Sequence, residues 1–215
     1  MSPAEFATSS HPLCLAMTGA SGAPFAVRLL HVLCQAGHAV HLTMSPSGAQ
    51  VLREETGIAV DLERFNVSAF GRLDPGKVVY HHHTDFNAGI ASGSFRTGGM
   101  VVAPCSMGTL ASIAHGISSN LITRAADVHL KERRRLILVP RECPLSVVHL
   151  ENMLSATRAG AVILPAMPGW YHRPRKLEDL VDFVVSRICD QLGIDNALVR
   201  RWGDEPGAAK EDEAS

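Results

Sequence analysis

Residues 139–142, Val-Pro-Arg-Glu, place a guanidinium and a carboxylate directly after a short apolar run. The run at 136–139 is typical of a buried strand, and it leads to Arg141 and Glu142 at its carboxyl end. Ligands of open α/β sheets bind at the carboxyl ends of the strands. An arginine beside a glutamate at that edge predicts a phosphate-binding group next to a group that handles protons.

Two turns rich in glycine and hydroxyl groups follow other apolar runs. Residues 18–23 read Thr-Gly-Ala-Ser-Gly-Ala, and residues 104–109 read Pro-Cys-Ser-Met-Gly-Thr. Glycine lets a ligand approach the backbone, and the helix after each turn presents free amide groups to an anion. Taken alone, each segment could equally be an ordinary tight turn or helix cap that binds no ligand. Together with Arg141 they predict one anion site. Because the dinucleotide pattern Gly-x-Gly-x-x-Gly is missing, a mononucleotide such as FMN fits better.

Several other patterns have a plainer explanation. Cys105 has no basic partner in its motif, which favours a small buried thiol over a nucleophile. Residues 81–83 are histidines, but adjacent side chains point in alternating directions and chelate a metal poorly. Residues 133–135 are three arginines, interpreted as solvated cations at a helix end. Arg124 and Lys131, in contrast, are predicted on a helix face that leads to the ligand-binding edge.

An aromatic turn, Pro-Gly-Trp-Tyr-His at 168–172, follows the last predicted strand. One interpretation is a surface loop packed on the core. The other is a lid over a small apolar ligand, with the Tyr171 hydroxyl reaching a polar head group. The sequence leaves both open.

The elements that position these residues alternate as in a parallel sheet. The predicted strands are 13–18, 39–44, 77–80, 100–103, 136–139 and 161–164. The predicted helices are 25–36, 49–56, 108–115, 120–130, 147–157 and 177–192, the last with Leu177, Leu180, Val184 and Ile188 on one face. We therefore predict an α/β fold, a Rossmann-like doubly wound parallel sheet of about six strands in three layers. Residues 1–11 are predicted to be a flexible arm, 12–203 a single domain and 204–215 a disordered tail.

Composition sets the broad class. The chain has 215 residues, 46% hydrophobic and 19% charged, and its net charge of -1 gives no reason to expect nucleic acid. Five cysteines without a Cys-x-x-Cys pair argue against a metal or disulfide framework and favour a reducing compartment. No signal peptide is visible, and the apolar runs are too short to span a bilayer. A cytoplasmic protein is the resulting expectation.

The order of these motifs resembles the flavin prenyltransferase (UbiX) family of the flavin-binding cysteine-decarboxylase-like superfamily. The likeness runs from residue 13 to residue 203. The segments that carry it are 18–23, 92–95, 104–110, 124–134, 139–142, 149–153, 160–166, 171–174 and 201–203.

That resemblance implies a Rossmann-like subunit of a large homo-oligomer, commonly a dodecamer, with active sites at subunit junctions. It implies bound FMN and a prenyl donor, dimethylallyl phosphate, whose dimethylallyl group is joined to reduced FMN. The product, prenylated FMN, is the cofactor of a partner decarboxylase of the UbiD type. Ubiquinone biosynthesis and aromatic acid decarboxylation are both open as the pathway served.

The resemblance also implies site residues by position. Those implied to contact FMN are Gly19, Ala20, Ser21, Ser45, Ser106, Met107, Gly108, Thr109 and Arg141. Those implied to bind the prenyl phosphate are Tyr171, Arg187, Lys131 and Arg124. Glu142, Ser21 and Lys131 are the implied catalytic residues, with Glu142 assisting proton movement. Phe86 lies where some members place a tryptophan against the prenyl group. In that reaction, arginine and lysine would stabilise the leaving phosphate, and an apolar wall would shield the cationic carbon from water. A metal is then unnecessary.

Two alternatives stay open. A flavin-dependent decarboxylase of cysteine-like carboxylates would share the fold. Such relatives typically carry a catalytic histidine after the first helix and an asparagine-rich loop, for which His31 and Asn120 are poor substitutes. A non-catalytic flavin carrier would bind FMN and hand it on.

Overall fold

The chain forms a six-stranded sheet in which the order of strands reverses beside the first. The computed structural model describes residues 11–203, so the predicted tail and nearly all of the predicted arm lie outside the described residues. The order is β3-β2-β1-β4-β5-β6, and all neighbours are parallel. The strands are β1 (Leu13–Met17), β2 (Val40–Met44), β3 (Val78–His82), β4 (Gly99–Cys105), β5 (Leu136–Pro140) and β6 (Val162–Ile163). This is the doubly wound arrangement, so the predicted fold is confirmed.

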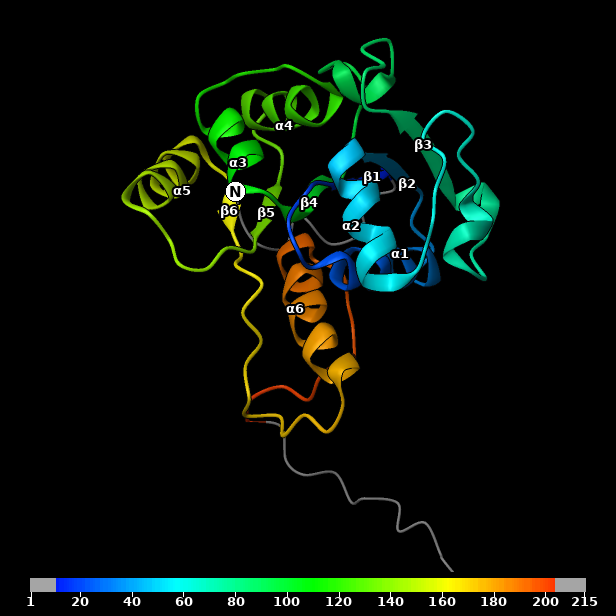
Figure 1. The fold of residues 1–215 in the computed structure, drawn as a ribbon, viewed down its shortest axis with the longest axis vertical. Helices are drawn as coiled ribbons and strands as arrows, with labels where there is room; N and C mark the ends of the chain where they lie inside the picture. The colour runs from blue at the N-terminus through cyan, green and yellow to red at the C-terminus, as the bar shows by residue number, and fades with distance from the viewer. Residues whose placement is uncertain (1–10, 204–215) are drawn as a thin grey trace, which may run out of the picture.

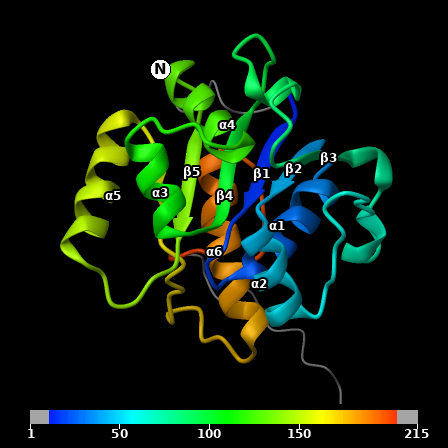
Figure 2. The same cartoon turned by 45° about the horizontal axis from the view of Figure 1, so that its top comes forward.

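Two groups of helices cover opposite faces of the sheet (Figure 1, Figure 2). One group is α1 (Ala23–Gln35), α2 (Pro46–Thr56) and α6 (Leu177–Leu192), and the other is α3 (Met107–Ala114), α4 (Leu121–Lys131) and α5 (Val147–Ala159). Successive side chains of a strand point to opposite faces, so each strand contributes to two cores. Leu15 and Met17 of β1 pack with the first group, and Cys14 and Ala16 pack with the second. The predicted three layers follow from this division.

Two predicted strand ends and one predicted core position need correction. β4 does not end at 103 but continues to Cys105, where pairing with Pro140 resumes after a register shift. β3 extends to His82, so two of the three adjacent histidines lie in the strand. Leu177 does not face the core but is 76% exposed, because the first turn of α6 extends beyond the sheet (Figure 1).

The chain after β6 leaves the body of the sheet. Residues 164–166 still pair with β5 through the amides of Leu164 and Ala166, and Ile194 is buried in the core. Residues 167–180 and 195–203 extend together beyond the sheet, at the bottom of Figure 1, and we call them the C-terminal projection. The rings of Tyr171 and Trp202 hold its two parts together, with centroids 5.3 Å apart. The rest of α6 is anchored in the core through buried residues such as Val184 and Ile188. The sheet therefore fixes one end of α6 and leaves the other end to form a separate surface.

Two observations bear on the class of protein. All five cysteines are free thiols. Within residues 11–203, the helices are all too short or too polar to cross a bilayer.

Candidate active site

The turns after β1 and β4 meet where the strand order reverses. The Thr18 hydroxyl donates to the Pro104 carbonyl at 2.8 Å and accepts from the Ser106 amide at 2.8 Å. The Thr18 amide also donates to the Pro104 carbonyl, at 3.1 Å. Thr18 is only 2% exposed, so these bonds are shielded from water. Ligands of doubly wound sheets bind at this reversal, and the two predicted nucleotide turns lie together there.

Helices α2 and α3 begin at the same edge with hydroxyl caps. The Ser45 hydroxyl accepts from the Gly48 amide at 3.0 Å, and the Ser106 hydroxyl accepts from the Thr109 amide at 3.2 Å. A side-chain carbon placed on Gly108 would meet no atom within 4 Å. The first turn of α3 is therefore open to a bound group, which fits the predicted contact of residues 106–109 with FMN.

Glu55 is a site residue that the sequence interpretation missed. Its Oε2 accepts from the amides of Gly22 and Ala23, both at 2.8 Å. Burial alone raises the pKa of Glu55, but hydrogen bonds from Ser21 and the two amides, helped by the charge of Arg141, bring it below its ordinary value. The prediction that α1 presents free amides to an anion is therefore wrong, because this carboxylate already accepts from them. Glu55 lies in no motif, and only its position in space reveals it.

Arg141 and Glu142 lie at the carboxyl end of β5, as predicted. Arg141 Nε donates to the Ser21 carbonyl at 3.4 Å, which joins this strand end to the turn after β1. Glu142 is exposed, and its Oε1 accepts from the Cys143 amide at 3.1 Å. A hollow of about 240 Å³ lies beside both residues and is also lined by Met153.

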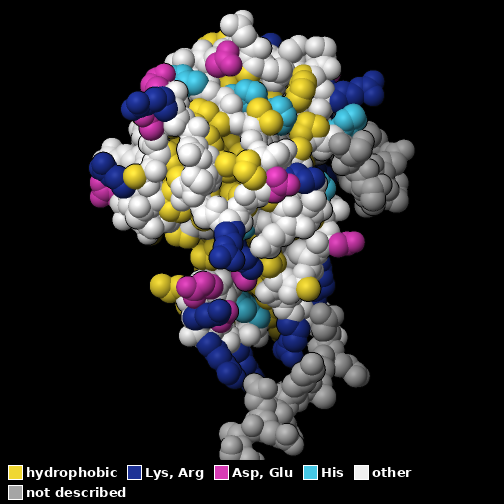
Figure 3. All heavy atoms as spheres, turned by 90° about the vertical axis from the view of Figure 1, so that its right-hand side faces the viewer, with side chains coloured by type: hydrophobic (Ala, Val, Ile, Leu, Met, Phe, Trp, Pro, Cys, Tyr) yellow, Lys and Arg dark blue, Asp and Glu magenta, His cyan; other side chains and the backbone are white. Residues whose placement is uncertain are grey.

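Tyr171 and Arg187 lie together in and beside the C-terminal projection. Both line a hollow of about 280 Å³. The Tyr171 ring contacts the Phe183 and Trp202 rings edge-on, with centroids 5.7 Å and 5.3 Å away. Arg187 Nη1 donates to Asp190 Oδ2 at 2.8 Å. On the face in Figure 3, the lower part of the molecule carries basic and acidic groups side by side.

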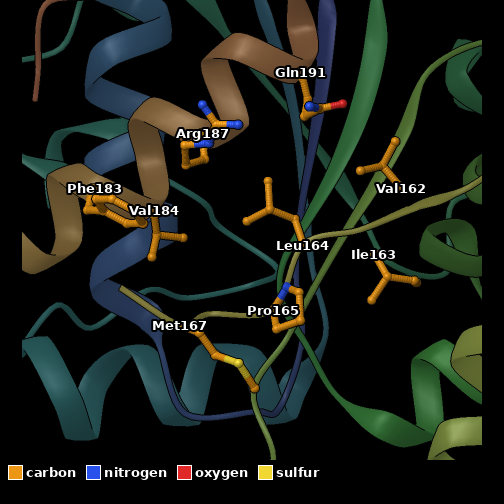
Figure 4. A pocket seen from close by; sticks show the side chains of 9 residues that line it. All are labelled: Val162, Ile163, Leu164, Pro165, Met167, Phe183, Val184, Arg187 and Gln191. Carbon is orange, nitrogen blue, oxygen red and sulfur yellow. The ribbon is translucent and has the colours of Figure 1, made fainter. Parts of the chain in front are cut away.

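A third hollow, of about 230 Å³, lies between these two (Figure 4). It shares Pro165 and Met167 with the hollow at Glu142. It shares Phe183 and Arg187 with the hollow at Tyr171. Figure 4 shows α6 on one side of it, and residues 162–167 on the other. Adjoining hollows thus lead from the carboxyl edge of β5 to Arg187.

The structure does not bring Lys131 and Arg124 to these hollows. Lys131 forms an ion pair with its neighbour Glu132, and Arg124 pairs with Asp127 at 3.0 Å. The chain just after α4 lies at the opposite edge of the sheet, because the Arg135 carbonyl accepts from the amide of Met100 at the start of β4. Lys131 at the end of α4 therefore lies away from the ligand-binding edge, which corrects that part of the prediction. The start of α4 does lie at the carboxyl edge, because the Leu121 amide donates at 2.8 Å to the carbonyl of His83, just after β3.

One further prediction about this region needs correction. Arg134 is not simply solvated: it donates to the Phe95 and Gly93 carbonyls at 2.7 Å and 2.5 Å, and so anchors the segment before β4. Phe86 is 48% exposed in the segment after β3.

The remaining candidates have structural roles. Cys105 is fully buried, as predicted, and burial raises the pKa of its thiol. His31 Nε2 hydrogen-bonds the Phe70 carbonyl at 2.9 Å, and Asn120 caps α4 by accepting from the Thr123 amide at 3.0 Å. Among residues 11–203, no group of three or more His, Cys, Asp or Glu side chains could hold a metal ion.

Comparison with known proteins identifies the family. Residues 2–189 match the family model described as Flavoprotein. The flavin prenyltransferase UbiX of Halalkalibacterium halodurans is 49% identical over 189 residues, which cover 88% of this chain and 92% of the relative. That of Pseudomonas aeruginosa is 49% identical over 195 residues, covering 89% and 93%.

Solved structures agree. AnUbiX (PadA1) in complex with FMN and dimethylallyl pyrophosphate has a TM-score of 0.81 and 42% identity, covering 90% of this chain and 98% of that one. A dodecameric FMN-dependent UbiX-like decarboxylase from Escherichia coli O157:H7 has a TM-score of 0.80 and 43% identity, covering 90% and 100%. The FMN-dependent cysteine decarboxylase TvaF, at 20% identity and a TM-score of 0.52, shares the fold alone.

The reversal of strand order, with two hydroxyl-rich turns meeting there, defines a Rossmann-like fold with its binding edge, and the family match makes it a flavoprotein. Within that class, the chain belongs to the flavin prenyltransferase (UbiX) family. The predicted family, enzymatic activity and FMN cofactor are thereby confirmed, and the cysteine decarboxylase alternative is not favoured.

Proposed function

We propose that this flavin prenyltransferase uses dimethylallyl phosphate as donor and supplies prenylated FMN to a UbiD-type decarboxylase in the cytoplasm. The observation that supports this most directly is the run of adjoining hollows from Glu142 to Arg187. It has a carboxylate at one end, apolar residues such as Leu164 and Met167 along it, and a guanidinium at the other end. A short isoprenoid phosphate has the matching distribution of polar and apolar groups.

The carboxyl edge would hold the flavin. Bound FMN supplies the ring that accepts the prenyl group. The residues proposed to hold it are Gly19, Ala20, Ser21, Ser45, Ser106, Met107, Gly108, Thr109 and Arg141. Because Glu55 accepts from the amides at the start of α1, we place the flavin phosphate near the open first turn of α3 instead.

Tyr171 and Arg187 would hold the donor phosphate. As the donor's C–O bond breaks, its electron pair leaves with the phosphate, and the positive charge of Arg187 stabilises that leaving group. The donor carbon forms its new bond to the flavin, and Glu142 assists the movement of the proton released there. The apolar lining of the intermediate hollow keeps water from the cationic donor carbon.

Lys131 and Arg124 would reach the site from a neighbouring copy in a homo-oligomer, which we propose to be a dodecamer. Helix α5 supports an interface between copies, because Val147, Val148 and Leu154 are 70%, 61% and 50% exposed. An apolar surface of this kind marks an interaction site.

The activity test is an anaerobic incubation with reduced FMN and dimethylallyl phosphate, with dimethylallyl diphosphate tested in parallel. We expect the flavin mass to increase by one prenyl unit. Glu142→Gln should slow the single-turnover rate and leave FMN bound, and an unchanged rate would contradict the proton-handling role. FMN binding without a mass change would support a carrier, and decarboxylation of aromatic acids by the isolated protein would contradict both.

A second experiment tests the shared site. Lys131→Ala and Glu142→Gln variants are co-expressed with different tags, and mixed oligomers are purified through both tags. If the two residues reach one site from different chains, some mixed sites are intact and activity exceeds that of either variant alone. If both residues act within one chain, the mixed oligomers stay as inactive as the variants.

A further inference from the structure

Asp190 on α6 accepts hydrogen bonds from three side chains. Arg187 Nη1 donates to its Oδ2 at 2.8 Å, and Arg201 donates to Oδ1 at 2.8 Å and to Oδ2 at 3.3 Å. Asn196 Nδ2 donates to Oδ1 at 3.3 Å. The Asp190 side chain is only 16% exposed, whereas the side chains of Arg187 and Arg201 are 51% and 53% exposed. One well-shielded carboxylate thus connects two exposed guanidinium groups.

Stability alone does not require two arginines on one carboxylate. The guanidinium groups of Arg187 and Arg201 are half exposed, so water and salt screen their attraction to Asp190, and holding two long side chains in place costs entropy. A carboxylate does, however, fix the direction of a guanidinium through the planar geometry of both groups. Arg187 uses one terminal nitrogen for Asp190, and a guanidinium has five N–H donors in all. The contact therefore orients Arg187 while leaving most of its donor capacity for another anion.

The hollow beside Asp190 has the charge of an anion site. Arg187, Arg200 and Arg201 line it together with Asp190, which gives a net charge of +2 from three positive groups and one negative group. Tyr171 and Ser186 add hydroxyl-bearing side chains to the same lining. A phosphate dianion matches both this charge and the planar guanidinium donors.

We propose that Asp190 is a positioning residue that holds Arg201 beside Arg187, so that two guanidinium groups instead of one bind the donor's phosphate. This inference rests on the proposed function for the role of Arg187. Arg201 is the added phosphate-binding residue, and Asp190 acts only through the two arginines. The shielded carboxylate keeps both cations in place before the donor arrives, which lowers the entropy lost on binding.

A purely structural role makes a different prediction. If Asp190 only fastens residues 194–203 to α6 through Asn196 and Arg201, its loss would loosen that segment without a selective effect on the donor. The discriminating quantity is the Michaelis constant for the donor compared with the dissociation constant for FMN, because FMN is proposed to bind at the carboxyl edge and not here.

The test compares the full-length enzyme with Asp190→Asn, Asp190→Glu and Arg201→Lys. In Asp190→Asn and Arg201→Lys we expect KM for dimethylallyl phosphate to rise about tenfold, the size of one charge-assisted hydrogen bond. The inhibition constant of inorganic phosphate should rise by the same factor. The dissociation constant for FMN, followed by flavin fluorescence, should stay unchanged. Asp190→Glu keeps a carboxylate and should recover part of the loss.

The outcomes separate cleanly. An unchanged donor KM in a folded, FMN-binding Asp190→Asn variant would overturn the inference. A parallel loss of donor binding, FMN binding and thermal stability would also overturn it, in favour of the structural role. If the wild-type enzyme prenylates no flavin, the proposed function fails. The inference is then tested separately, by whether inorganic phosphate protects Arg187 and Arg201 from phenylglyoxal in the wild type but not in Asp190→Asn.

Discussion

The carboxyl edge of the sheet and the C-terminal projection hold their polar groups in opposite ways. At the edge, the buried Thr18 hydroxyl joins two turns through bonds of 2.8 Å to Pro104 and Ser106. At the projection, Arg187 and Arg201 are half exposed and share Asp190. Removing one partner of a buried hydrogen bond is expensive, whereas exposed ion pairs contribute about 0–1 kcal/mol. The edge is therefore a rigid support, and the projection presents half-exposed cations that a bound anion can reach.

Helix α6 connects the two regions through its own periodicity. Val184 and Ile188 are buried on the sheet side, and Arg187, between them in sequence, is exposed on the other side. Because 3.6 residues make one turn, neighbouring positions serve different faces. The core thus fixes the position of Arg187 along α6, while Asp190 fixes the direction of its guanidinium.

The largest expected effect concerns His129, which lies on α4 and is buried beneath it. It is fully buried, with Nε2 2.8 Å from the Thr97 hydroxyl and Nδ1 2.7 Å from the Ala125 carbonyl, and burial lowers its pKa from 6.5 to about 4. The unfolded chain binds this proton below pH 6.5, but the folded chain does so only near pH 4. Stability present above pH 6.5 is therefore lost as the pH falls, by up to about 3 kcal/mol.

Urea unfolding between pH 7 and pH 4 measures this loss. Other groups also titrate in that range. The decisive quantity is therefore the slope of the unfolding free energy against pH, compared between the wild type and His129→Gln. The variant should lose stability less steeply on acidification. Identical slopes would show that His129 titrates normally in the folded chain.

The next effect is at Gly48, where the turn after β2 packs on β1. A side-chain carbon there would lie 2.7 Å from the Met17 carbonyl oxygen, and backbone cannot move aside as a flexible side chain can. Gly48→Ala should destabilise the fold by about 2–3 kcal/mol and weaken FMN binding. Gly108→Ala is the matched control for stability, because its added carbon meets no atom within 4 Å. Equal stability of the two variants would contradict a tightly packed edge.

A smaller effect is expected from the Thr18 hydroxyl. Thr18→Val keeps the shape but leaves the Ser106 amide without this partner, which should lower the free energy of unfolding by about 1–2 kcal/mol. Thr18→Ser keeps the hydroxyl and should recover most of the hydrogen-bond contribution. The dissociation constant for FMN should rise in Thr18→Val more than in Thr18→Ser. If the two variants bind FMN equally, the bridge between the turns does not support the flavin site.

The sequence predicted those parts of the molecule that depend on local patterns. Helix α6 has the predicted bounds, because its apolar spacing and its terminal Gly193 are local signals. The alternation of strands and helices likewise predicted the doubly wound sheet, and with it the meeting of residues 18–23 and 104–109 at one edge.

Contacts between distant residues were not predictable in this way. Glu55 reaches the start of α1 from the last turn of α2, and no short motif contains both. Lys131 is a different case: because α4 ends just before β5 begins, the alternation of elements itself places the end of α4 at the amino edge of the sheet. Arg201 meets Asp190 only because the chain reverses at Gly193, where the backbone is left-handed. The contacts of Glu55 and Arg201 thus depend on the path of the chain between elements, which local patterns do not specify.

The smallest effect on stability should come from the projection itself. Arg201→Ala, or a rise in salt from about 0.05 M to about 0.5 M, should change the free energy of unfolding by less than about 1 kcal/mol. The Arg201 guanidinium is half exposed and screened, and Asp190 still accepts from Arg187 and Asn196 when Arg201 is removed. The same changes should raise the donor KM, since electrostatic attraction to a phosphate is screened equally. Urea unfolding and initial-rate kinetics on the same samples measure both quantities. A loss above about 2 kcal/mol in Arg201→Ala would mean that the projection is as rigid as the edge. Asp190 would then be read as part of the folded core, and the contrast between the two regions would disappear.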